Sequence, residues 1–277
     1  MARILIIRFS ALGDVAMTIP VIHSLAVQYP QHEITVLSRA VWQPLFQGLP
    51  ANVGFVGADL TGKHKGLWGL NSLYSELKAM HFDYIADFHH VLRSKYLCLR
   101  FRLANKPVAS ICKGRAGKKK LVRRHDKVME NQKSSFRRYA DVLEKLGLPV
   151  LLNFSSIYGE GKGNFAEIEP VTGPKEDQKW IGIAPFAKHA GKIYPLELQE
   201  QVIAHFAANP KVKVFLFGGG KSEQDVFDAW IAKYPSVVSM IGKLNMRTEL
   251  NLMLSLIHIF RAHETSQDLV CRLLLEK

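Results

Sequence analysis

The sequence lacks several features that would place it in a special class of protein. No apolar run approaches the roughly 20 residues that a helix needs to cross a bilayer. Only three cysteines are present, Cys98, Cys112 and Cys271, and their spacing fits neither a disulfide framework nor a metal-ligand set. The first residues read directly as a strand, so we expect no signal peptide. These absences predict a globular protein of the reducing cytoplasm.

Acidic residues are also scarce, with 24 against 37 lysines and arginines, for a formal net charge of +13. Much of the excess lies in one stretch, in which Asp126 is opposed by Lys113, Arg115, Lys118, Lys119, Lys120, Arg123, Arg124 and Lys127. One interpretation is a solvated, mobile basic loop. The other is a binding surface for a polyanion, which could be nucleic acid, an anionic membrane face or a phosphorylated substrate.

Short apolar runs do alternate with helical patterns, which is typical of an α/β protein with parallel strands. In the first part of the chain the expected strands are 4–7, 34–37, 53–56, 84–86 and 108–111. The expected helical segments are a stretch that begins near Asp14 and ends at about Gln28, then 41–47, 67–80, 94–103 and 134–146. Gly147 and Pro149 supply an ordinary helix stop. Residues 1–150 are therefore predicted to form one doubly wound, Rossmann-like domain.

The pattern loosens over residues 151–179, whose composition is that of a linker. A second series of strands at 180–184, 212–217 and 237–240, with a helix over 196–208, predicts a second Rossmann-like domain over 180–253. We expect two such domains facing across a cleft, the second of them incomplete.

The alternation of strand and helix patterns ends at Leu254. The stretch LSLIHIFRAHET and residues 269–275 match, in order, the translation of an adaptor used in DNA sequencing libraries. We therefore expect residues 254–277 to be an adaptor read-through artefact, with no functional weight for His258 or His263. Charges in this tail cancel, so the positive excess belongs to residues 1–253. The alternative is an ordinary amphipathic C-terminal helix.

The first strand-to-helix turn, RFSALGDV, lacks the G-x-G-x-x-G fingerprint of dinucleotide-binding proteins. It offers only Gly13, and the second strand ends in Ser38 and Arg39, which argues against a nicotinamide dehydrogenase. Asp14 follows Gly13 at the start of a helix. It is either a helix cap or a carboxylate that faces the ligand crevice of the sheet, and spacing alone does not choose.

Two loops of the second series could hold a ligand. FLFGGGKSEQD is not a Walker A loop, because Phe215 stands where its first glycine is required. Three glycines there still allow a close backbone approach, and Glu223 is either a dipole-favoured residue or a ribose contact. Lys188 and Lys192 follow the strand 180–184; they are either surface lysines or cations for a diphosphate. In the first domain, Asp87 and its neighbouring histidines match no familiar metal site, so no metal is assigned.

Four stretches together resemble glycosyltransferase family 9, the ADP-heptose:lipopolysaccharide heptosyltransferases. They are ILIIRFSALGDVAMTIPVIHSL, FDYIADFHHVLRS, APFAKHAGKIYP and FLFGGGKSEQD, and the resemblance covers residues 3–253. It implies the GT-B architecture of two Rossmann-like domains around a cleft, and sugar transfer with inversion, without a metal or other cofactor.

The resemblance also implies site roles. Asp14 would be the general base, Lys192 would hold the donor diphosphate, and Glu223 would contact the ribose. Lys188, Gly218 and Gly219 complete the expected donor site. The expected acceptor residues are Ser10, Gly13, Asp87, His89, Arg93, Lys63, Lys65, Lys118, Lys119 and Lys120.

The implied partners are a nucleotide sugar, ADP-heptose, and an anionic glycolipid acceptor, the inner core on lipid A. The implied place is the cytoplasm, in peripheral contact with the inner membrane, and nucleic acid is not an expected partner. Two departures stand out. The family's later glycine-rich donor loop is absent, which predicts an enzyme impaired by truncation, and DFHH replaces a common glutamine-glycine pair. The alternative function is a non-catalytic basic module that binds nucleic acid or anionic membranes.

Overall fold

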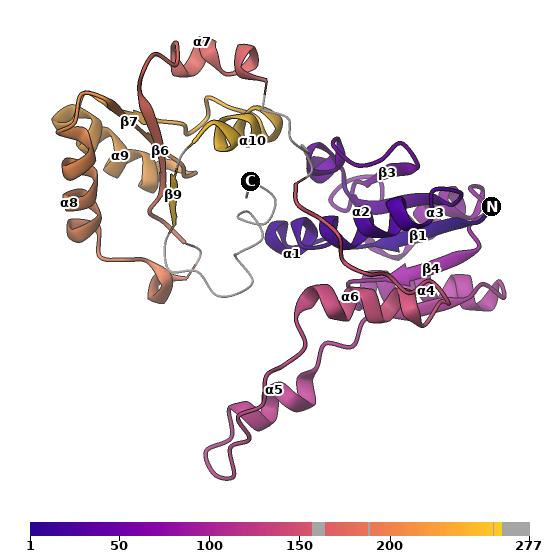
Figure 1. Ribbon diagram of the computed structural model, residues 1–277. Helices are drawn as coiled ribbons and strands as arrows, with labels where there is room; N and C mark the ends of the chain where they lie inside the picture. Colours follow the sequence, from indigo (N-terminus) through magenta and orange to yellow (C-terminus); the bar gives the residue numbers. More distant parts are fainter. Residues whose placement is uncertain (157–163, 188, 257, 262–277) are drawn as a thin grey trace. The chain divides into compact units, whose positions relative to one another are not determined.

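The computed structural model describes residues 1–156, 164–187, 189–256 and 258–261 (Figure 1). It divides the chain into two compact units at about residue 157. Each unit is built around its own fully parallel sheet. Within the described residues, no helix is long and apolar enough to cross a membrane.

The sheet of the first unit has five strands in the order β3-β2-β1-β4-β5. Their bounds are β1 Arg3–Ile7, β2 Glu33–Arg39, β3 Val53–Ala58, β4 Tyr84–Asp87 and β5 Val108–Ser110. All five strands that the sequence predicts are present, and the doubly wound fold is confirmed. At the carboxyl end of β1, Ile7 is in register with Leu37 of β2 and with Asp87 of β4.

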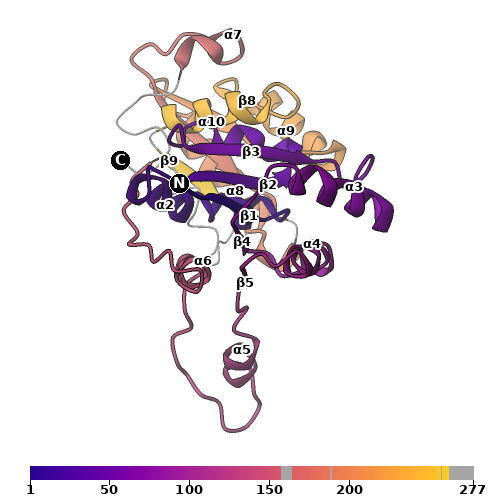
Figure 2. The ribbon, with the colours of Figure 1, turned by 90° about the vertical axis from the view of Figure 1, so that its right-hand side faces the viewer.

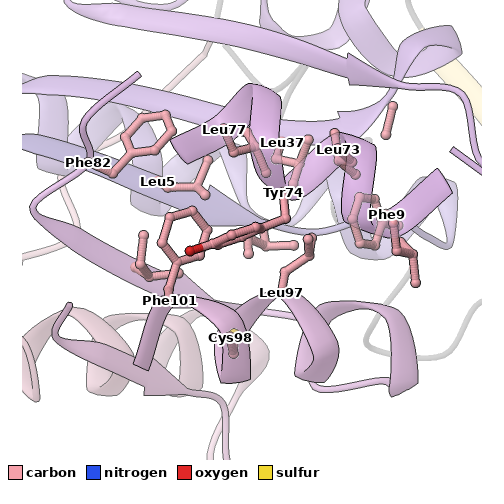
Figure 3. Close-up of a cluster of buried hydrophobic side chains, with 14 of the residues drawn as sticks. Leu5, Phe9, Leu37, Leu73, Tyr74, Leu77, Phe82, Leu97, Cys98 and Phe101 are labelled. Atoms are coloured by element: carbon pink, nitrogen blue, oxygen red, sulfur yellow. The ribbon is translucent and has the colours of Figure 1, made fainter. Parts of the chain in front are cut away.

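Helices cover both faces of this sheet because its central strands are apolar on both sides. Helices α3 (Gly66–Lys78) and α4 (Leu92–Leu103) cover one face. Figure 3 shows the core between them and the sheet, where Leu5 and Phe82 lie near Tyr74, Leu77 and Phe101. Helices α2 (Ile19–Gln28) and α6 (Ser135–Glu144) pack together on the opposite face (Figure 2).

The helical stretch predicted from about Asp14 to Gln28 is two helices, α1 (Leu12–Ala16) and α2. Pro20 has no N–H and cannot donate to the carbonyl of Ala16, so a continuous helix would lose this hydrogen bond. Thr18 occupies the break, and its hydroxyl donates to the carbonyl of Val15 at 2.6 Å. The short α1 therefore aims Asp14 independently of the longer α2.

Two other segments of the first unit differ in detail from the prediction. The expected helix over 41–47 is a 3-10 helix, η1 (Ala40–Phe46). The basic stretch contains a helix, α5 (Arg115–Leu121), with no buried residue. After α6, the chain that was predicted to be a linker first runs along α2. There the backbone N–H of Leu151 donates to Gln28 Oε1 at 3.0 Å, and that of Asn153 to Ser24 Oγ at 2.9 Å.

The sheet of the second unit has the order β8-β7-β6-β9, all parallel. Its strands are β6 Lys179–Ala184, β7 Val212–Leu216, β8 Val237–Ser239 and β9 His258–Arg261. Its helical elements are η2 Phe165–Glu167, α7 Glu169–Thr172, η3 Ala190–Lys192, α8 Leu196–Ala207, α9 Lys221–Lys233 and α10 Met246–Ser255. The predicted second α/β series is confirmed.

Two stretches of this unit fall where the sequence predicts a linker and an artefact. Residues 165–172 are helical, and Ile168 is fully buried beside Trp180 and Phe215, so this part of the predicted linker belongs to the core. Strand β9 lies inside residues 254–277 and pairs with β6 through its backbone. Such pairing says nothing about the origin of the codons, so the adaptor hypothesis stays a prediction. Residues 262–277 lie outside the described residues.

Candidate active site

The carboxyl ends of β1 and β4 mark the point at which the strand order of the first sheet reverses. From β1 the chain winds to β2 and β3 on one side, and then to β4 and β5 on the other. Helices on opposite faces leave a crevice outside the strands at such a point, and open α/β proteins bind ligands there. The loops that follow β1 and β4, with the ends of the strands and helices that they join, carry the expected residues Ser10, Gly13, Asp14, Asp87, His89 and Arg93.

Arg8, the first residue after β1, ties these two loops together. Its residue surface is only 8% exposed. Nη1 donates to the carbonyl of Phe88 at 2.8 Å, and Nη2 forms an ion pair with Asp14 Oδ2. Its Nε is buried without a hydrogen-bond partner. A buried guanidinium requires a counter-charge, and Asp14 supplies it.

Asp14 is the third residue of α1, and its side chain is 33% exposed. Besides the ion pair with Arg8, Oδ2 accepts a hydrogen bond from the backbone N–H of Ala11 at 3.4 Å. Its own carbonyl accepts from the hydroxyl of Tyr139 at 3.3 Å. One carboxylate oxygen is thus anchored, while part of the group stays open to a ligand. Asp14 is therefore a residue of the first helical turn with a partly exposed carboxylate, and its role as a carboxylate that faces a ligand stays a prediction.

Tyr139 of α6 contacts both Phe88 and the backbone of Asp14. Its ring stacks on Phe88, with the ring centroids 4.7 Å apart. Burial raises the pKa of Tyr139 to about 12, so its hydroxyl keeps its proton and donates to Asp14 at neutral pH. Tyr139 links α6 to both loops of the candidate site.

His89 is buried next to Arg8 and faces Ser10. Its Nδ1 accepts from the backbone N–H of Phe9 at 3.4 Å, which assigns the ring proton to Nε2, 3.5 Å from Ser10 Oγ. Burial lowers the pKa of His89 to about 3, and the charges of Arg8, Lys113 and Arg93 act in the same direction. The imidazole is therefore neutral at physiological pH and presents a polar but uncharged group beside Ser10.

Asp87, at the end of β4, shapes the second loop from inside. Its side chain has no exposed surface. Oδ1 accepts from the backbone N–H groups of His89 and His90 at 2.9 and 2.8 Å, and Oδ2 accepts from Ser94 Oγ at 3.2 Å. The expectation that Asp87 touches an acceptor is therefore corrected: its carboxylate is used up by the loop and orients His89. Gly13 in α1 and Arg93 in α4 are open at the same end of the sheet.

The loop after β3 carries Lys63 and Lys65. Lys63 Nζ pairs with Glu76 Oε1 of α3 at 2.8 Å. His64 between them is buried, and its Nδ1 accepts from the backbone N–H of Asp59 at 3.1 Å. Lys65 is exposed just before α3. This pair lies at the carboxyl end of the sheet, two strands away from β1.

Lys118, Lys119 and Lys120 do not join the residues around Asp14. They lie in α5, which stands away from the sheet in both views (Figures 1 and 2). The basic stretch is therefore a separate surface, and the sequence could not reveal that separation.

The second unit offers a loop of different character. After β7, Gly218, Gly219 and Gly220 precede α9, and Glu223 in its first turn accepts from the N–H of Gly219 through Oε2 at 2.8 Å. A Cβ on Gly218 would lie 2.6 Å from that oxygen and 3.1 Å from the ring of Phe227, so a side chain there would displace Glu223 and press on the buried ring. Lys192 ends η3 in the loop after β6, the neighbouring strand. Lys188 lies outside the described residues.

The described residues were compared with two more expectations, the absence of a metal site and the cleft between the two units. Among the residues that the structure describes, no three histidine, cysteine or acidic side chains are grouped to hold a metal ion. Each unit is defined by itself, so the meeting of Asp14 with Lys192 across a cleft stays a prediction.

Sequence reasoning missed Arg8 and Tyr139. Arg8 had a usable signal, because a charged residue directly after four buried apolar residues needs a partner nearby. Tyr139 had none beyond its place on an amphipathic helix.

No model of a protein family matches the sequence, and no curated protein matches it. Solved structures do. A family 9 glycosyltransferase from Veillonella parvula DSM 2008 superposes with a TM-score of 0.74 at 18% identity, over 98% of this chain and 77% of that one. The chain has the fold of family 9 glycosyltransferases.

Two Escherichia coli heptosyltransferases share this fold. WaaC, solved with ADP-2-deoxy-2-fluoro heptose, gives a TM-score of 0.71 at 14% identity, over 98% of this chain and 86% of that one. ADP-heptose lps heptosyltransferase II gives 0.63 at 18% identity, over 98% and 82%. A UDP-N-acetylglucosamine 2-epimerase from Listeria monocytogenes matches more weakly, at 0.52. The parallel-sheet α/β fold, which matches that of GT-B glycosyltransferases, agrees with the fold class that the sequence predicts.

Proposed function

We propose that the chain is a metal-independent, inverting glycosyltransferase that moves a heptose from ADP-heptose to the inner core of lipopolysaccharide on lipid A. The observation that carries the proposal is the partly exposed carboxylate of Asp14, anchored by Arg8 at the reversal point of the first sheet. The fold supports it, and the WaaC structures with ADP and with an ADP-heptose analogue support a nucleotide-sugar donor.

In this reaction an acceptor hydroxyl oxygen bonds to the anomeric carbon while the bond from that carbon to the donor diphosphate breaks. Asp14 takes the proton of the hydroxyl, and inversion follows because the base acts on the face opposite the leaving group. A positioned general base contributes about 10²–10⁴-fold in rate. The anchored Oδ2 fixes the direction of the carboxylate, and the remaining oxygen is available to the hydroxyl.

The donor would lie against the second unit. Lys192 would neutralise the charge that develops on the leaving diphosphate, as a metal ion does in other transferases. The exposed glycines Gly219 and Gly220 would let the nucleotide approach the backbone closely. Glu223 already accepts from Gly219, so a ribose hydroxyl would share that carboxylate. Lys188 remains a proposed donor contact.

The acceptor would lie against the first unit. Ser10, Gly13 and the neutral His89 would line the position of the reacting sugar, next to Asp14. Arg93, Lys63 and Lys65 would attract the phosphates and carboxylates of an anionic glycolipid. Asp87 would act through the loop that it shapes, and Lys118, Lys119 and Lys120 would engage more distant anionic groups.

Transfer from ADP-heptose to a lipid A acceptor that carries its inner-core sugars tests the proposal. In Asp14→Asn, which keeps the shape of the side chain but cannot take the proton, we expect kcat to fall about 10²–10⁴-fold. Donor binding, measured by calorimetry with ADP-heptose, should be unchanged. Lys192→Gln should show the opposite pattern, with donor binding weakened about tenfold or more.

Asp228→Asn is the matched control, because Asp228 is an exposed carboxylate of α9. It should leave both transfer and donor binding unchanged. If Asp14→Asn turned over normally, the assignment of the base would be wrong. If other nucleotide sugars were transferred in preference to ADP-heptose, the assignment of the donor would be wrong.

A further inference from the structure

A basic arm, defined as residues 112–133, leaves the first unit between β5 and α6. It carries nine lysines and arginines against two carboxylates, Asp126 and Glu130. Its helix α5 buries no residue, and Figure 2 shows the arm extending away from the sheet, beyond α6. The base of the arm is attached to α6, where Arg138 Nη1 donates to the carbonyl of Lys113 at 2.8 Å.

Within the residues that the structure describes, most of this positive charge has no ion pair with a carboxylate. Lys133, at the end of the arm, pairs with Asp141 at 2.7 Å. Lys118, Lys119 and Lys120 are exposed and form no ion pair within the described part of the chain. Like charges held this close repel one another, and an external anionic surface relieves that repulsion.

Two large apolar side chains are exposed among these charges. Val122 is 79% exposed and Met129 is 78% exposed. The backbone N–H of Val128 donates to the carbonyl of Lys120 at 3.4 Å, which brings the returning segment beside the end of α5. Val122 and Met129 each lie within two residues of this contact, so both belong to the distal half of the arm. Apolar side chains surrounded by lysines are the composition of a surface that inserts shallowly into a bilayer.

The composition favours lipid over nucleic acid as the partner. The arm contains no phenylalanine, tyrosine or tryptophan. Surfaces that bind single strands combine positive charge with aromatic rings on which bases stack. Exposed valine and methionine gain nothing from a phosphate backbone, but they leave water when they enter the acyl boundary of a membrane.

We propose that the distal half of the basic arm docks on bilayers rich in anionic phospholipid. Lys118, Lys119 and Lys120 lie against the headgroups, and Val122 and Met129 enter the acyl boundary. This docking shares Lys118, Lys119 and Lys120 with the acceptor side of the proposed function, but it rests on the charge and exposure of the arm and is measured by vesicle binding, without sugar transfer. A failure of either proposal therefore leaves the other standing.

Co-sedimentation of the full chain with vesicles tests the electrostatic part. We expect binding to vesicles of phosphatidylcholine mixed with phosphatidylglycerol, none to phosphatidylcholine alone, and weakening with added salt. A basic residue near an anionic surface is worth about fivefold in partition, so the triple variant Lys118→Gln, Lys119→Gln, Lys120→Gln should bind about 100-fold more weakly. The matched control changes the exposed Lys78, Lys95 and Lys145 to Gln and should bind nearly as the parent does.

A second pair of variants tests insertion. Val122→Ser with Met129→Ser should weaken partition about tenfold or more. Leu103→Ser with Leu151→Ser, which changes two equally exposed leucines of the first unit, should not. None of the arm variants removes a buried side chain, so their thermal unfolding should match that of the parent.

Three results would overturn the proposal. The first is equal loss of binding in the arm triple and its control, which would reduce the effect to net charge. The second is unchanged binding in the Val122 and Met129 variant. The third is tighter binding to an RNA oligonucleotide than to anionic vesicles at the same salt concentration.

Discussion

The loops at the carboxyl ends of the two sheets differ in the residues that build them. In the first unit, the loops after β1 and β4 are held by buried charged and polar side chains, chiefly Arg8, Asp87 and His89. In the second unit, the loop after β7 consists of Phe217 and three glycines, and Glu223 of α9 accepts a hydrogen bond from its backbone. One loop system fixes side-chain groups in space, and the other leaves backbone open to solvent.

The first kind of loop suits a site that transfers protons, and the second suits a site that binds an anionic ligand. Groups that move protons need a defined direction, and the hydrogen bonds around Asp14 provide it. A large anionic ligand needs close access to backbone N–H groups instead, and glycine allows such access. Variants of the two loops should therefore respond differently, with large losses of stability in the first unit and smaller, more local ones in the second.

The largest expected effect comes from Asp87→Ala. This change leaves the buried backbone N–H of His89 and the part-buried N–H of His90 without their acceptor, so the free energy of unfolding in urea should fall by about 3 kcal/mol. Asp87→Asn keeps one acceptor oxygen and should recover most of the loss. Equal losses in the two variants would show that the carboxylate charge, and not the pattern of acceptors, stabilises the loop.

A smaller effect concerns His89 and pH. The pKa of His89 is lowered from 6.5 to about 3 in the folded chain, so between these values the unfolded state binds the extra proton. Stability from this residue is complete above about pH 6.5 and is lost as the pH falls. Between pH 6.5 and pH 5 the parent should lose about 2 kcal/mol more than His89→Gln, at roughly 1.4 kcal/mol per pH unit. Urea titrations of both proteins at the two pH values measure this difference, and parallel losses would contradict the assignment.

The smallest effect is expected in the glycine loop. In Gly218→Ala the new methyl group would meet Glu223 Oε2 at 2.6 Å and the buried ring of Phe227 at 3.1 Å, which should cost about 1–2 kcal/mol in thermal unfolding of the second unit. Gly219→Ala is the matched control. A Cβ there meets no atom within 4 Å, so its stability should change by less than about 0.5 kcal/mol. Equal changes would mean that the loop tolerates side chains throughout.

The sequence predicted the strands of both sheets well, because buried parallel strands are continuous apolar runs with clear ends. It predicted less of the helices and connections. The break between α1 and α2 depends on a single proline, and residues 165–172 are polar enough to resemble a linker although Ile168 is fully buried. Whether such a segment packs is decided by partners distant in the chain, here Trp180 and Phe215.

The candidate site was also predicted only in part from the sequence. Asp14 could be named from its place after the first strand, but its ion pair with Arg8 depends on the fold of the turn. Asp87 was expected to face a ligand because it ends a strand, and instead it is enclosed by its own loop. Local sequence reveals which residues reach the end of the sheet, whereas hydrogen-bond partners decide which of them remain open to a ligand.

Two consecutive residues of α6 join features that are far apart in the chain. Arg138 holds the base of the basic arm through Lys113, and Tyr139 holds the turn that carries Asp14. Helix α6 therefore holds the base of the basic arm and the backbone at Asp14 in a fixed relation to each other. When the arm is bound to a surface, α6 therefore fixes the distance between that surface and Asp14.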